Sequence, residues 1–137
     1  PQQADKSLIS TAARALGIAI SLYETPIALQ RLQHYLPLNL LHSHGESEDA
    51  LFARKFTENI AAVFEEMGQK SASYLEETNL ALLNLDDSLK PAFLSLCQVR
   101  PLLKQVQKTP NPVNEIKPLS ALSVQWHLWR SARKGQF

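Results

Sequence analysis

Apolar residues recur every three or four positions between residues 47 and 67, which is the spacing of one face of an α-helix. This apolar face consists of Leu51, Phe52, Phe56, Ile60, Val63, Phe64 and Met67. Ser47 is a suitable N-cap and Gly68 a suitable stop, so the pattern predicts a single helix over 47–67. Such a helix has to bury its apolar face, and we therefore expect Phe56 and Phe64 to be core residues around which other segments pack.

Similar patterns predict further helices on both sides of this central one. The expected helices cover residues 5–17, 25–36, 71–87, 88–107 and 119–134. Thr25-Pro26 predicts a helix start, because proline costs nothing in a first turn, whereas Pro101 predicts a kink or a division within 88–107. Residues 18–23 and 122–129 fit either a helix or a strand, since both spacings of apolar residues occur there.

These elements, with few β-branched residues beside leucine and alanine, predict an all-α fold: a single-domain bundle of five or six helices. A chain of 137 residues with 45% hydrophobic content is long enough for one core and short for two. Residues 1–107 are expected to form the bundle. Three prolines predict a Pro-rich linker at 108–118. Residues 119–137 then form an aromatic and basic C-terminal segment that packs on the bundle or extends from it.

The sequence predicts no membrane span, because no apolar run approaches the roughly 18 to 20 residues that a bilayer requires. The chain begins with Pro1 rather than Met, from which we expect an excised domain that lacks its targeting segment. Cys97 is the single cysteine, so no internal disulfide can form, and this favours a cytoplasmic location. Apolar neighbours predict that its thiol is buried and unreactive rather than a catalytic nucleophile.

Charge is distributed unevenly along the chain, although the net charge is only +1. Residues 38–90 contain ten acidic and four basic residues, a net charge of −6. Residues 91–137 contain seven basic residues and one acidic residue, a net charge of +6. Either the two segments face each other within the fold or are simply solvated, or the basic end meets an acidic partner.

The C-terminal segment combines tryptophan with arginine, the residue types most enriched in binding hot spots. The candidate partner-binding residues are Trp126, Trp129, Arg130, Arg133 and Lys134. The alternative is that both tryptophans close the core while the basic residues complement the helix C-terminus. We expect Trp126, which is aligned with Leu122, to be buried and Trp129 to be partly exposed.

Residues 9–28 have part of the pattern of a helix-turn-helix motif. Ala12, Leu16 and Gly17 suit its first helix and turn, but Pro26 would lie inside the recognition helix. Aromatic residues interleaved with basic ones, as in the C-terminal third, can also stack on bases and hold phosphates. A nucleic-acid-binding regulator is therefore the alternative function.

The loop that contains His42, His44 and Glu46 carries ligand types suited to zinc or a related metal. Neither an HExxH motif nor paired CxxC motifs occur to support these weak candidates. A metal-dependent enzyme that uses this loop is a further alternative, and we expect neither a metal nor another cofactor.

No catalytic constellation emerges from the sequence, which also lacks a Gly-rich phosphate-binding loop. We therefore expect no catalytic residues and no enzymatic activity. The predicted function is that of a non-enzymatic protein–protein interaction or regulatory domain. Its expected partner is another protein, acidic in character, with nucleic acid as the alternative and a second copy of the chain as a further option.

Overall fold

The computed structural model describes residues 2–135 and 137. Its elements in chain order are α1 (Gln2–Gln30), α2 (Leu38–Ser43), α3 (Glu48–Phe52), α4 (Glu58–Leu82), the 3-10 helix η1 (Lys90–Gln98), α5 (Val99–Lys108) and α6 (Ala121–Lys134). The described residues contain no β-strand, so the predicted all-α fold is confirmed. The two segments that fitted either a helix or a strand, 18–23 and 122–129, are both helical.

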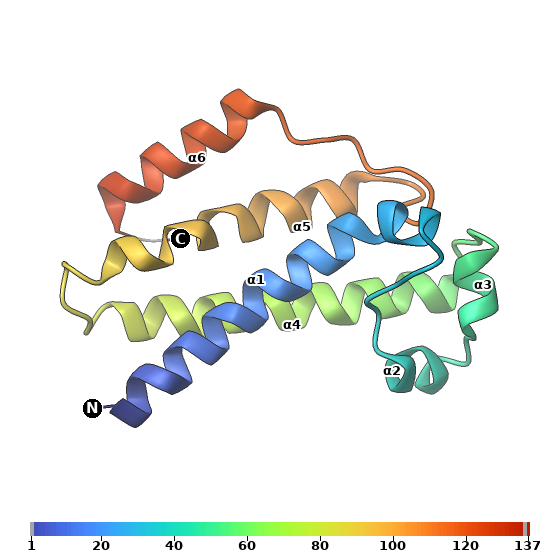
Figure 1. The fold of residues 1–137 in the computed structure, drawn as a ribbon, viewed down its shortest axis with the longest axis horizontal. Helices are drawn as coiled ribbons and strands as arrows, with labels where there is room; N and C mark the ends of the chain where they lie inside the picture. The colour runs from blue at the N-terminus through green and yellow to red at the C-terminus, as the bar shows by residue number, and fades with distance from the viewer. Residues whose placement is uncertain (1, 136) are drawn as a thin grey trace.

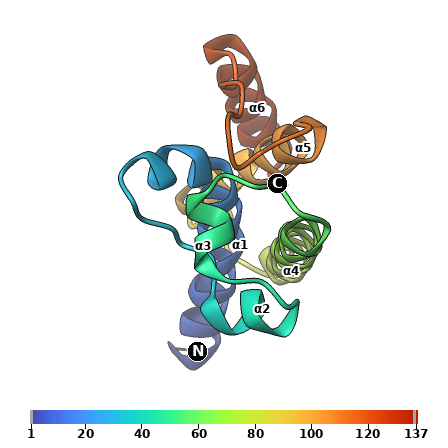
Figure 2. The ribbon, with the colours of Figure 1, turned by 90° about the vertical axis from the view of Figure 1, so that its right-hand side faces the viewer.

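The long helices α1 and α4 pack against each other at the centre of the molecule (Figure 1). α5 and η1 also pack on α1, and α6 packs on η1. In both views α6 lies at one edge of the molecule, far from α2, which is at the opposite edge (Figures 1 and 2). α1 thus forms interfaces with α4, α5 and η1, and much of the core lies along it.

Residues 47–67 do not form the single helix that the pattern predicted. α3 ends at Phe52, the backbone at Arg54 takes a positive φ of 55°, and α4 begins at Glu58. Thr57 causes this second start, because its side-chain oxygen accepts a hydrogen bond from the amide of Ile60 at 3.2 Å, as an N-cap does. The apolar face is therefore divided, and Phe52 is exposed while the α4 part of the face is buried.

α4 continues through Gly68 to Leu82, so the predictions of a stop at this glycine and of a new helix near Ser71 are wrong. The buried face continues beyond Gly68 through hydroxyl residues. Ser71 donates a hydrogen bond to the carbonyl of Ala15 at 2.7 Å, and Thr78 donates one to the carbonyl of Tyr74 at 2.7 Å. A hydroxyl that is satisfied in this way can be buried at little cost, which an apolar pattern does not reveal.

α1 is also longer than predicted, because it passes through both Gly17 and Pro26 without a break. Thr25 does not cap a new helix. Its hydroxyl donates instead to the carbonyl of Ser21 at 2.9 Å within the same helix. Since no turn occurs at Gly17, the helix-turn-helix interpretation of residues 9–28 is wrong.

Residues 88–107 do not divide at Pro101 as predicted: the 3-10 helix η1 passes into α5 between Gln98 and Val99, two residues before the proline. Pro101 lies in the first turn of α5, where its missing N–H removes no helical hydrogen bond. The Pro-rich segment after α5 lies against the bundle, because the side chain of Val113 is completely buried. The amide of Leu119 also donates to the Tyr23 hydroxyl at 3.2 Å.

Two histidine–glutamate pairs attach the short helices to the bundle. Nε2 of His34 lies 2.7 Å from Oε1 of Glu48, which joins the segment between α1 and α2 to α3. Nε2 of His44 lies 2.8 Å from Oε2 of Glu66 on α4. Hydrogen bonds from Lys70 and from His44 lower the pKa of the Glu66 carboxyl, so this group is an anion at neutral pH.

We expect Gly68→Ala to stabilise the protein. Gly68 lies inside α4 and is buried, yet a Cβ added to it would meet no atom within 4 Å. Alanine is preferred over glycine in a helix interior by about 0.5–1 kcal/mol, because glycine loses more backbone entropy on folding. Urea denaturation should show this gain, and a loss of stability would mean that α4 is interrupted at this position.

Candidate functional site

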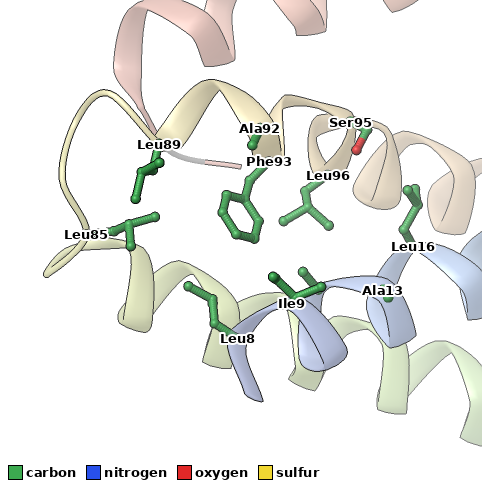
Figure 3. Close-up of a pocket in the computed structure, with 11 residues that line it drawn as sticks. Leu8, Ile9, Ala13, Leu16, Leu85, Leu89, Ala92, Phe93, Ser95 and Leu96 are labelled. Atoms are coloured by element: carbon green, nitrogen blue, oxygen red, sulfur yellow. The ribbon is translucent and has the colours of Figure 1, made fainter. Parts of the chain in front are cut away.

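An apolar pocket lies between α1 on one side and η1, with the segment that leads into it, on the other (Figure 3). Its lining consists of Leu8, Ile9, Ala12, Ala13, Leu16, Leu85, Leu89, Ala92, Phe93, Ser95 and Leu96. Figure 3 shows the ring of Phe93 pointing from η1 toward the side formed by α1. One wall of the pocket is a face of α1. Spacings of three and four residues place Leu8, Ala12, Ala13 and Leu16 on this face.

The pocket has the chemistry of a site for an apolar ligand. Its volume is about 370 Å³, and none of its eleven lining residues carries a charge. Ser95 contributes the one hydroxyl among them. Ile9 and Leu89 are 59% and 53% exposed, so the pocket opens to solvent, and an apolar group that filled it would remove these side chains from water.

α6 presents the aromatic residues of the predicted partner-binding site to solvent. Trp126 is 55% exposed, so the prediction that it is buried is wrong, and Trp129 is partly exposed as predicted, at 52%. The two indole centroids are 5.2 Å apart, and the Arg133 guanidinium lies 4.9 Å from the Trp129 ring. Arg130, Arg133 and Lys134 are exposed, and partner binding by these residues stays a prediction.

The orientation of α6 follows from which of its faces meets η1. Val124 and Leu128, four residues apart, are partly buried, whereas Leu122 is 80% exposed. Ser120 caps the helix by accepting a hydrogen bond from the amide of Ser123 at 3.1 Å, and Gly135 ends it with a φ of 62°. The Val124 and Leu128 face lies inward, and Trp126 therefore points outward.

The residues of the candidate metal loop have separate partners. His44 pairs with Glu66, while Glu46 accepts a hydrogen bond from the Thr57 hydroxyl at 2.6 Å. His42 is exposed at the end of α2. In the described part of the chain, no group of three His, Cys, Asp or Glu side chains is placed to hold a metal ion.

Cys97 is 5% exposed, and burial raises the pKa of its thiol. We expect native protein to react with a thiol reagent at least tenfold more slowly than unfolded protein, because reaction needs an exposed thiolate. Absorbance after addition of an aromatic disulfide, with and without denaturant, measures both rates. Equal rates would show that the thiol is accessible in the folded state.

The helices and the apolar pocket define an all-α protein with an uncharged pocket between α1 and η1. The chain belongs to the squalene/phytoene synthase family, whose family model matches residues 1–130. No solved structure shows a significant match.

Two curated relatives are the mouse (Mus musculus) and rat (Rattus norvegicus) proteins named NADH dehydrogenase (ubiquinone) complex I, assembly factor 6. Each is 24% identical to this chain over 121 residues. The match covers 82% of this chain and 36% of each relative, so the chain corresponds to about a third of their length.

These comparisons correct the function predicted from the sequence. The predicted function of a non-enzymatic interaction or regulatory domain is wrong, because the chain belongs to the squalene/phytoene synthase family. The two alternative functions, a nucleic-acid-binding regulator and a metal-dependent enzyme that uses the His42 loop, are wrong for the same reason. The similarity amounts to 24% identity over 121 residues, a level at which no short motif in a single sequence identifies the family.

Within the described residues, no helix combines the length and hydrophobicity needed to span a bilayer.

Proposed function

We propose that this chain acts in the assembly of a multi-subunit NADH dehydrogenase. The observation that carries the proposal is its similarity to the mouse and rat assembly factors over 82% of its length. Such a role requires protein partners, and it requires no chemical step on a small molecule. The expectations of a protein partner and of no enzymatic activity are therefore both part of this proposal.

The test is to remove the gene in the organism of origin and to follow the complex. We expect less fully assembled NADH dehydrogenase on native gels and lower NADH:ubiquinone activity in isolated membranes. Re-expression of the intact gene should restore both. An unchanged amount of assembled complex after gene removal would overturn the proposal.

A second candidate function is the binding or conversion of an isoprenoid, favoured by the apolar pocket between α1 and η1. Squalene and phytoene, for which the family is named, are long hydrocarbons, and a pocket lined by uncharged side chains suits part of such a chain. Ala13 lines the pocket and is exposed, so Ala13→Phe should fill this space with little effect on the core.

Ala13→Phe separates the two candidates. If isoprenoid binding is the function, the variant should lose affinity for a prenyl ligand and fail to rescue gene removal. If assembly is the function and the pocket is not needed for it, the variant should restore the complex as well as the unaltered gene does. Arg14→Gln on the same helix is the control for expression and stability, because its exposed side chain is not part of the pocket lining.

A further inference from the structure

A second pocket of the molecule lies between α5 and α6 and is strongly basic. Five cationic side chains line it, Arg100, Lys104 and Lys108 from α5 and Arg130 and Lys134 from α6. Its volume is about 520 Å³, and no Asp or Glu occurs among the described residues that line it. Cations gathered around one concave surface raise the local potential and attract anions.

These five cations are not neutralised within the described part of the chain, where none of them lies within 4.0 Å of a carboxylate. The ion pairs there are formed instead by His34, His44, Lys70 and Lys90. The acidic middle of the chain therefore does not pair with the basic pocket, whose charge remains available to an external anion.

An apolar strip lies beside this pocket on α6. Leu122, Trp126 and Trp129 are all exposed, and their i, i+4 and i+7 spacing places them on one face of the helix. Arg130 follows Trp129 directly and lines the pocket, so the strip and the pocket adjoin. α6, which carries the strip and part of the pocket lining, lies at the edge of the molecule (Figures 1 and 2).

We infer that this side of the molecule docks on an anionic lipid bilayer, with headgroup phosphates in the basic pocket and the two indoles in the membrane interface. Indole rings prefer the membrane–water interface. A helix with Trp and Leu on one face and Lys and Arg beside them lies in the interface plane. An acidic protein partner would need carboxylates for the basic pocket and, next to them, a groove for the two indoles. An anionic bilayer offers negatively charged headgroups and an interface for indole rings over its whole surface.

The test measures binding of the full chain to vesicles of phosphatidylcholine with and without phosphatidylserine. We expect binding to the anionic vesicles only, and binding that weakens as salt is raised. Trp126 and Trp129 are the two tryptophans of the sequence, so the protein's tryptophan fluorescence reports on α6 alone. Its maximum should move to shorter wavelength on binding, because the indoles leave water.

Charge is tested with Lys104→Gln/Lys108→Gln. A basic residue near an anionic membrane contributes a factor of about five to partitioning, so the double variant should bind about 25-fold more weakly. The matched control is Lys6→Gln/Lys55→Gln, which removes the same charge from exposed positions on α1 and before α4. We expect this control to change partitioning less than twofold at physiological salt.

The apolar strip is tested with Trp126→Ser/Trp129→Ser, measured by sedimentation with vesicles because this variant has no tryptophan. We expect at least a tenfold loss of binding with an unchanged melting temperature, since both side chains are about half exposed. Tyr35→Ser, which removes a 53% exposed aromatic side chain elsewhere, should bind like the unaltered protein.

Three results would overturn the inference. Equal binding to neutral and anionic vesicles, or to neither, would exclude recognition of an anionic bilayer. Saturable binding of inorganic pyrophosphate without vesicle binding would mean that the pocket takes a small soluble anion. Binding of polyglutamate without vesicle binding would identify an acidic protein as the occupant. The inference does not depend on the assembly role, because it is measured on the purified chain.

Discussion

Phe64→Ala is expected to lower the free energy of unfolding by about 3–5 kcal/mol, the usual cost of truncating a buried phenylalanine. Phe64 is 6% exposed and belongs to the core formed by α1, α4 and α5. A domain of this size has a total stability of about 5–15 kcal/mol. The variant should therefore be close to marginal stability, which chemical denaturation followed by circular dichroism would measure.

Phe56→Ala provides a comparison, because it truncates a phenylalanine that is less buried than Phe64. Phe56 packs edge-to-face on Phe64 with ring centroids 5.7 Å apart, but it lies before α4 and is only partly buried. We expect its truncation to cost clearly less than that of Phe64, because fewer contacts are lost and little cavity remains. Equal losses, or a loss below about 1 kcal/mol for Phe64→Ala, would mean that the α4 face does not form the core.

The sequence predicted the helical class and much of the core, because apolar spacing records which face of a helix is buried. It misplaced the ends of α1 and α4 for two physical reasons. Pro26 and Gly68 look like boundaries, but contacts elsewhere in the fold outweigh their local preferences. Ser71 and Thr78 look like solvent positions, yet each satisfies its hydroxyl with a carbonyl and is buried.

The sites were less predictable than the fold, because each depends on how distant elements approach each other. The apolar pocket joins α1 to η1, about 80 residues further along the chain, and no local pattern marks it. The cations of the basic pocket were visible in sequence as a net charge of +6 over residues 91–137. That they surround one concave surface follows only from the packing of α6 beside α5 and η1.

Ala15→Leu is expected to destabilise the protein by about 1–3 kcal/mol through overpacking. Ala15 is completely buried where α1 packs on α4, and its carbonyl accepts the 2.7 Å hydrogen bond from the hydroxyl of Ser71, which is also completely buried. A larger side chain would force the two helices apart here, because the interface is already closed. Ala72→Leu, at the exposed position next to Ser71 on α4, is the control and should change stability by less than about 0.5 kcal/mol.

A double-mutant cycle shows whether Ala15 and Ser71 form one contact. Ser71→Ala alone should cost about 0.5–1.5 kcal/mol, the net contribution of one hydrogen bond. If leucine at position 15 separates the helices, it already breaks that bond, and the double variant should lose less than the sum of the two single losses. Additive losses would mean that the Ser71 hydroxyl does not hold α1 against α4. The two helices would then be held together by apolar packing alone, and the hydrogen bond from Ser71 to Ala15 would not account for the burial of this serine.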